Sequence, residues 1–254
     1  MSVRRAAAGT LPLLAAAAAL GLWWLVKWSF GWQAFILPSP AEVARELWDQ
    51  RSFLPGQAWT TVVETLEGFA IAVGVGVALA VLIAYSRALE RSLYPVLVAL
   101  NAVPKLALAP ILVLWMGFGT GPKVAMVVLL CVFPIVLSTA TGLTSTAAEL
   151  DELVRSLSAS ELQAFRKVRF PAALPHIFVG LKVGISLAVI GAVIGEFVGA
   201  TRGLGYVIVA SGQNADTTLA FASIALLAAL SVVLFYSLVA LERWLVPWAR
   251  HEQT

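Results

Sequence analysis

Long apolar runs separated by short polar segments are the feature that most constrains this chain. Hydrophobic residues make up 60% of its 254 residues and charged residues 12%, whereas a soluble domain carries about 25% charged residues. A segment inside hydrocarbon must satisfy its own backbone hydrogen bonds, so only helices and closed barrels cross a membrane. Runs of about 20 apolar residues match one helical span each. The sequence therefore predicts an all-α, polytopic membrane protein.

Six segments have the length and hydropathy of membrane spans. They are residues 10–30, 58–85, 93–118, 124–143, 175–200 and 219–246. Pro104 and Pro110 are expected to interrupt the third span, because proline breaks helices. The stretch "FILPSPAEVARELWDQRSF" predicts a proline turn followed by a short amphipathic helix. The first span resembles a signal peptide in length, but its alanines lie inside the apolar run, which favours an uncleaved anchor.

The distribution of lysine and arginine predicts the orientation of the spans. One side would hold ten basic residues: Arg4, Arg5, Arg87, Arg91, Arg155, Arg166, Lys167, Arg169, Arg243 and Arg250. The other would hold five: Lys27, Arg45, Arg51, Lys123 and Arg202. Cytoplasmic loops carry the excess of positive charge, so we expect both termini in the cytoplasm.

The sequence offers little that would support chemistry in this chain. Cys131 is the single cysteine, which excludes an intrachain disulfide, and His176 and His251 lack a metal-ligand spacing. No nucleophile elbow, phosphate loop or HExxH motif is present. The net charge of +3 gives no indication of nucleic-acid binding. An enzyme acting by itself is therefore not expected, nor is a metal or cofactor in this chain.

Charged residues inside spans cost about 2.5–3.5 kcal/mol each on insertion scales, so they are candidates for function. They are Glu64, Glu67, Lys105, Lys182 and Glu196. Each could equally be paired inside the protein or anchored at an interface. We predict that Asn101, Lys105 and Glu196 line a solute path. The first two are the strongest candidates, since a proline-broken helix frees backbone groups that must face protein or a wet cavity.

Glycines recur at intervals of four in the fifth span. Gly191, Gly195 and Gly199 form one series, and Gly180 and Gly184 lie one register earlier. This spacing allows helix backbones to approach closely. It indicates either helix packing within one subunit or a seam between two subunits.

A polar stretch, "TAAELDELVRSLSASELQAFRKVRFPAALP", interrupts the apolar pattern between the fourth and fifth spans. Thr146 with Glu149, and Ser158 with Glu161, have the spacing of capping boxes. Apolar residues at helical intervals predict two short amphipathic helices that meet near Ser158, the second ending at Pro171. Such a segment either lies on the lipid surface or docks a cytoplasmic partner.

This stretch resembles the "EAA" loop of binding-protein-dependent ABC importer permeases. Glu152 stands for the glutamate of that motif, Ser158 for its glycine, and Val168-Arg169-Phe170-Pro171 for its end. Two departures are clear: Leu153 and Val154 replace the alanines, and Ser158 replaces a glycine that would permit a left-handed turn.

The resemblance extends over nearly the whole chain. "ILPSP", "EGFAIAVGVGVAL", "VPKLALAPILVLWMGFG", "FPIVLSTATGL" and "RGLGYVI" are similar to the nitrate/sulfonate/taurine-type subfamily. "PKLALAP" and "GEFVGA-RGLGY" are closer to permeases for pyrimidine precursors or riboflavin.

The resemblance implies a single permease domain over residues 1–254, with six spans and the fold of a type I ABC importer permease. It implies uptake of a small polar or anionic solute across the cell inner membrane. The implied partners are ABC ATPase subunits that bind ATP and Mg, a second permease copy, and a periplasmic or lipid-anchored substrate-binding protein. Residues 146–171 would be the coupling segment, with the ATPase contacts made by Glu152, Leu153, Arg155, Leu157, Ser158, Ala159 and Pro171.

Two other functions fit an apolar chain of this length. An ion-coupled secondary transporter usually shows inverted repeats and more spans, and neither is visible in this sequence. A membrane scaffold without transport activity would recover no ATPase in a pull-down.

Overall fold

A computed structural model of the chain describes residues 2–145, 156 and 159–248. The described residues form helices and connecting turns, with no strand among them. The helices, in chain order, are α1 (Ser2–Phe30), α2 (Pro40–Asp49), α3 (Leu54–Tyr85), α4 (Arg87–Ala102), α5 (Lys105–Met116), α6 (Gly121–Thr144), α8 (Glu161–Ala164), the π-helical turn η1 (Phe165–Arg169), α9 (Phe170–Phe197), α10 (Leu204–Gln213) and α11 (Thr217–Leu245).

The predicted spans all coincide with helices. Four continuous helices are long and apolar enough to cross a membrane: Leu54–Tyr85, Gly121–Thr144, Glu161–Phe197 and Thr217–Leu245. The pair α4 and α5 makes a fifth span, bent by 92° at its break. The first predicted span is helical throughout as α1, which includes the apolar segment Leu14–Phe30. The prediction of an all-α polytopic membrane protein is confirmed.

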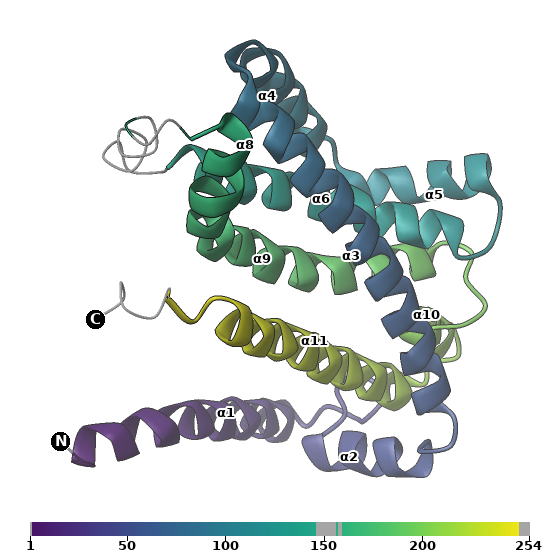
Figure 1. Ribbon diagram of the computed structural model, residues 1–254. Helices are drawn as coiled ribbons and strands as arrows, with labels where there is room; N and C mark the ends of the chain where they lie inside the picture. The colour runs from purple at the N-terminus through teal and green to yellow at the C-terminus, as the bar shows by residue number, and fades with distance from the viewer. Residues whose placement is uncertain (1, 146–155, 157–158, 249–254) are drawn as a thin grey trace.

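The helices α3, α6 and α9 pack together in the centre of the molecule (Figure 1). The start of α1, the end of α11 and α8 lie toward one side, whereas α2, α10 and the end of α5 lie toward the other. This arrangement places α8, which precedes α9, on the same side as the start of α1.

Glycines form the seam between α6 and α9. A Cβ at Gly191 would lie 2.8 Å from the Val127 Cα, and one at Gly195 would lie 2.6 Å from the Lys123 Cα. A Cβ at Gly180 would lie 2.8 Å from the Ser138 Cβ of α6, and one at Gly184 would lie 3.2 Å from the Phe69 ring of α3 and 3.3 Å from the Ile135 side chain of α6. The packing interpretation within one subunit is therefore confirmed for these four positions. Around the seam, Val127, Cys131, Ile135, Ala188 and Ala192 are fully or almost fully buried.

The helix α2 begins with a capping box that the sequence analysis did not identify. The Glu42 N–H donates to the Ser39 hydroxyl, and the Ser39 N–H donates to the Glu42 carboxylate at 2.6 Å. Lys27, near the end of α1, also donates to Glu42. The hydrogen bonds from Lys27 and from the Ser39 backbone lower the pKa of Glu42 from 4.5 to about 2. Because the folded pKa is lowered, this contact stabilises the α1–α2 corner at neutral pH and is lost as the pH falls below about 4.5 toward 2.

The third span breaks at only one of its two predicted prolines. The helix α4 ends at Ala102, and Val103 is extended, with φ −64° and ψ 131°, as expected for a residue before proline. Pro110 lies inside α5 and does not interrupt it, so that prediction is wrong. Proline in a helix interior removes one hydrogen bond, and neighbouring helices in membrane proteins tolerate the loss. Pro134 and Pro175 lie inside α6 and α9 in the same way.

The helix α8 begins with a capping box that was not predicted: the Ser160 N–H donates to Gln163 at 2.9 Å, and the Gln163 N–H donates to the Ser160 hydroxyl at 3.3 Å. Glu161 pairs with Arg169, and Ser158, its predicted capping partner, lies outside the described residues. The structure corrects the prediction that Pro171 ends the helix. The π-helical turn η1 precedes it, with the Phe170 N–H donating to the Phe165 carbonyl, and the helix continues to Phe197. The predicted cap at Thr146 lies outside the described residues.

One helix, α10, was absent from the predicted elements. It occupies Leu204–Gln213, after a loop in which Gly199 and Gly203 adopt φ values of 83° and 111°. These values favour glycine because other residues are strained there. The fifth predicted span ends at Phe197 rather than at residue 200, and the chain then turns into α10.

Candidate functional site

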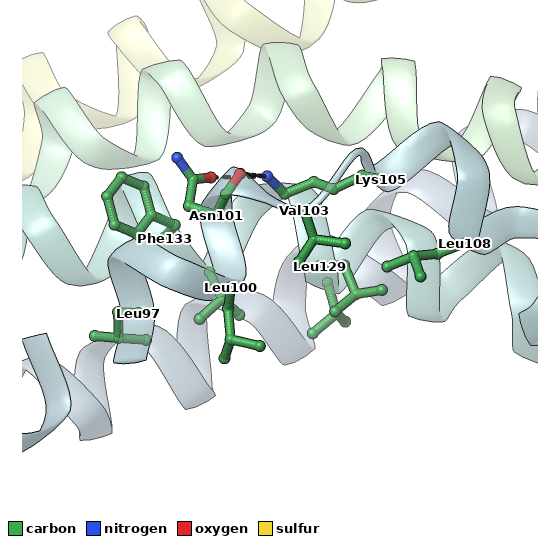
Figure 2. Close-up of a pocket in the computed structure, with 10 residues that line it drawn as sticks. Leu97, Leu100, Asn101, Val103, Lys105, Leu108, Leu129 and Phe133 are labelled. Carbon is green, nitrogen blue, oxygen red and sulfur yellow. Dashed lines mark hydrogen bonds between the residues drawn. The ribbon is translucent and has the colours of Figure 1, made fainter. Parts of the chain in front are cut away.

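The break between α4 and α5 opens beside a cavity of about 340 Å³. The cavity is lined mainly by apolar side chains of α4, α5 and α6 (Figure 2). Its lining residues are Leu97, Leu100, Asn101, Val103, Lys105, Leu108, Val128, Leu129, Val132 and Phe133. A mostly apolar hollow with few polar groups is typical of a small-molecule site.

Asn101 and Lys105 supply the polar side chains of this cavity. The Lys105 ammonium donates to the Asn101 side-chain oxygen at 2.7 Å and to the Asn101 backbone carbonyl at 2.9 Å. Figure 2 shows the two side chains pointing toward each other across the break. The last carbonyls of a helix lack intrahelical partners and carry partial negative charge. The break therefore explains why a lysine is stable here: it binds the end of α4.

Lys105 differs from three other lysines in the apolar helices, each of which pairs with a glutamate. Lys27 pairs with Glu42, Lys123 pairs with Glu64 at 2.5 Å, and Lys182 pairs with Glu242 at 2.9 Å. Within the part of the chain that the structure describes, no carboxylate pairs with Lys105. Pairing within the protein, one of the two readings of the intramembrane charges, is thus confirmed for Lys182 and Glu64.

A second polar region, which we call the buried network, lies where α3, α6, α9 and α10 meet. It consists of Thr61, Glu64, Lys123 and Glu196, and the exposed fractions of the two glutamates are 1% each. The Thr61 hydroxyl donates to the Glu196 carboxylate at 2.7 Å. Together with the Lys123–Glu64 pair, this contact joins α3 directly to both α6 and α9.

The first N–H groups of α10 bind to this network. The Leu204 N–H donates to the Thr61 hydroxyl at 2.9 Å, and the Gly205 N–H donates to the Glu196 carboxylate at 2.5 Å. Just before the helix, the Gly203 N–H donates to the Gln57 side chain at 2.8 Å. A Cβ at Gly203 would overlap the Glu196 carboxylate. The glycines of "RGLGY" therefore let a carboxylate approach the helix start, where its charge is stabilised.

The structure thus brings together two of the three predicted path residues. Asn101 and Lys105 share one cavity, whereas Glu196 belongs to the buried network. Glu196 also borders a separate polar cavity of about 400 Å³, which Tyr206, Gln213 and Asn214 help to line. That these residues line a solute path stays a prediction.

The predicted ATPase-coupling residues fall mostly outside the described part of the chain. Glu152, Leu153, Arg155, Leu157 and Ser158 are not described. Ala159 precedes the cap of α8, and Pro171 lies in the first turn of α9. Their role as ATPase contacts also remains a prediction.

Sequence reasoning missed Thr61, Gln57 and Lys123. Lys123 was counted as a flanking loop charge, but it lies inside α6 with its side chain 9% exposed. The signal that could have found it was Glu64, because a buried carboxylate requires a cationic partner.

Comparison with known proteins identifies the family. Residues 72–251 match the model for the binding-protein-dependent transport system inner membrane component. The chain belongs to this family. It is 39% identical to the riboflavin transport system permease RibX of Chloroflexus aurantiacus, covering 86% of this chain and 82% of that protein. It is 34% identical to the formylaminopyrimidine transport permease ThiX of Halalkalibacterium halodurans (87% and 88% covered) and 29% identical to the taurine permease TauC of Escherichia coli K12 (94% and 88% covered).

A solved structure shows the same fold. A chain of the MetNI methionine ABC transporter, in an inward-facing conformation, superposes with a TM-score of 0.63 at 22% identity, covering 78% of this chain and 97% of that one. The predicted family, its sulfonate, taurine and vitamin-precursor branch, and the type I importer fold are confirmed. The protein is a multi-pass membrane permease of an ABC transport system.

The two internal lysine pairs differ in burial, and this difference predicts their contributions to stability. Lys123→Met would leave the buried carboxyl groups of Glu64 and Glu196 without their cation and should lower the free energy of unfolding by about 3 kcal/mol or more. Lys182→Met should cost less, about 1 kcal/mol, because the side chains of that pair are 23% and 20% exposed. Thermal unfolding of the purified chain in detergent measures both. Equal losses for the two variants would contradict the account of the buried network.

Proposed function

We propose that the break between α4 and α5 forms the solute path of an ATP-driven importer, and that Lys105 binds a negative or strongly polar group of the solute. The observation that carries this proposal is the position of Lys105. It is the lysine that faces a cavity at a broken span while having no acidic partner among the described residues.

The hydrogen-bond capacity of Lys105 supports this role. A lysine ammonium has three N–H donors, and Asn101 accepts two of them. The acceptors are neutral, so the positive charge is not cancelled and one donor is left for a ligand. A lone charge in an apolar span is costly and typically marks a substrate or ion pathway.

The cavity lining suggests the solute class. Leucines, valines and Phe133 surround the polar pair and would contact the carbon part of a solute. We infer a small organic anion or polar heterocycle, such as a sulfonate or a pyrimidine- or riboflavin-like vitamin precursor. The names of the relatives, which include taurine, riboflavin and formylaminopyrimidine permeases, support this range.

Partners would complete the importer. Family membership supports ATPase subunits carrying ATP and Mg, a second permease copy and a substrate-binding protein. Residues 146–171 would dock the ATPase. The helix that follows runs unbroken from Glu161 to Phe197, so a displacement of the docking segment would reach the glycine seam and Glu196. The π-helical turn η1 lies at the start of this helix, and such turns often lie at functional sites.

In Figure 1 the start of α1, the end of α11 and α8 lie toward the same side. With the excess of Lys and Arg on that side, we predict that it faces the cytoplasm. Reporter fusions after Arg51 and after Arg202 should give an outside signal, and a fusion after Arg155 an inside signal. An outside signal at Arg155 would refute this topology.

For the path itself, Lys105→Met should weaken transport while assembly stays intact. Loss of one charged hydrogen bond costs about 1.5–3 kcal/mol, which corresponds to a rise in apparent KM of about tenfold or more. Lys105→Arg, which keeps the charge, is the control and should retain most of the uptake. Uptake of labelled taurine, an aliphatic sulfonate, riboflavin and formylaminopyrimidine should be compared in vesicles. Unchanged kinetics in Lys105→Met for every transported solute would show that Lys105 is structural.

For the coupling segment, Glu152→Lys should leave the permease folded but weaken ATPase binding. Removing one member of a partly buried interfacial charge pair costs about 2–5 kcal/mol, or roughly thirtyfold or more in affinity. Glu161→Lys is the matched control, because the Glu161 side chain is 74% exposed and lies in the same polar stretch. Ser158→Gly should be tolerated, since it restores the family residue. Co-purification and uptake are the measurements. Full ATPase binding and full uptake in Glu152→Lys would favour a segment that lies on the lipid surface.

A further inference from the structure

The buried network has an unbalanced set of charges. Two carboxyl groups, Glu64 and Glu196, face one ammonium, Lys123, and all three side chains are buried. Two ionised carboxylates would leave a net charge of −1 where water cannot screen it. An uncompensated charge in such surroundings is strongly unfavourable. The network therefore needs one more positive charge.

The hydrogen bonds of the four carboxyl oxygens show where that charge belongs. Three oxygens accept a hydrogen bond: Glu64 Oε1 from Lys123 at 2.5 Å, Glu196 Oε1 from Thr61 at 2.7 Å, and Glu196 Oε2 from the Gly205 N–H at 2.5 Å. The fourth, Glu64 Oε2, is buried without a partner. Thr61, which donates to Glu196 at 2.7 Å, lies one turn before Glu64 on α3, so the two carboxyl groups belong to the same buried cluster. Glu196 is therefore the carboxylate in this cluster that can accept a hydrogen bond from Glu64.

We propose that this network is a binding site for one proton, held on Glu64 Oε2 and donated to the Glu196 carboxylate. The proton makes the network neutral, since one ammonium then balances one carboxylate. It also gives the fourth oxygen a hydrogen bond. Every oxygen of the pair is satisfied, as buried polar groups require.

The groups around Glu64 indicate that the additional positive charge is a proton. The charged groups that interact with Glu64 are Lys123 on α6, Glu196 on α9 and Glu67 on α3, and Glu67 is exposed. The helix α10 contributes backbone N–H groups to the network. Among the described residues, no group of three or more ligating side chains could hold a metal ion. A proton needs only the two carboxyl groups that are present.

A route for the proton is visible next to the site. The polar cavity of about 400 Å³ is bordered by Glu196, with Tyr206, Gln213 and Asn214 in its lining. Water in this cavity could exchange a proton with the carboxyl pair. The bound proton forms a hydrogen bond between Glu64 on α3 and Glu196 on α9. Glu196 also accepts a hydrogen bond from Gly205 at the start of α10. Release of the proton would leave two carboxylates in repulsion at this junction.

The variant Glu64→Gln tests the site because its amide has the geometry of the protonated acid. The amide oxygen can accept from Lys123, and the amide N–H can donate to Glu196. We expect Glu64→Gln to unfold at the same temperature as the wild type, in the full chain in detergent at neutral pH. Glu64→Ala should unfold at a lower temperature, because Lys123 and Glu196 both lose a partner. At alkaline pH the wild type should lose more stability than Glu64→Gln.

Infrared spectroscopy measures the proton itself and does not depend on folding energetics. The wild type at neutral pH should show the C=O stretch of a buried protonated carboxylic acid, and Glu64→Gln should lack it. Glu67→Gln, one turn along α3, is the control and should keep it. Persistence of the band in Glu64→Gln would overturn the proposal, as would equal destabilisation by Glu64→Gln and Glu64→Ala. A thermal midpoint that rises with sodium at constant ionic strength would also overturn it, since an alkali cation would then occupy the site.

Discussion

The buried contact between Lys123 and Glu64 joins α6 to α3. Because either side chain would be costly to bury without its partner, the contact fixes the two helices relative to each other. Thr61 and Glu196 extend the contact to α9, and backbone N–H groups extend it to α10. Four helices thus share one polar centre, and the glycine seam between α6 and α9 continues from it along the rest of the bundle.

A lysine inside a span needs acceptors for its positive charge, and the kind of acceptor distinguishes structural lysines from the lysine that we assign to function. Lys182 and Lys123 have carboxylate partners, whereas Lys105 is held by the neutral acceptors of Asn101. The Lys105 ammonium is stabilised by the free carbonyl at the end of α4, which exists because the helix breaks at Pro104. The same break lies beside the cavity. On α6 the polar centre uses Lys123, whereas the cavity is lined by Val128, Leu129, Val132 and Phe133.

Hydropathy was sufficient to predict the spans, and motif similarity was sufficient to predict the family. The predictions that were wrong concern prolines, which end some helices and lie inside others. Pro110 and Pro171 were expected to interrupt helices, but tertiary packing and a π-helical turn accommodate them. The cap of α8 at Ser160, where Gln163 returns the hydrogen bond, was not predicted. Asn101 and Lys105 could be paired from sequence, since they are four residues apart. The contact between Thr61 and Glu196 spans 135 residues, and no local pattern indicates it.

The central claim is that this permease moves a solute through the broken span using ATP hydrolysed on a partner subunit. The most direct measurement is solute uptake by proteoliposomes that contain the permease, with and without its ATPase, at fixed ion gradients. The account predicts uptake that requires both ATP and the ATPase and does not change when proton and sodium gradients are collapsed. Uptake that persists without the ATPase and follows an imposed ion gradient would contradict it and would identify the chain as a secondary transporter.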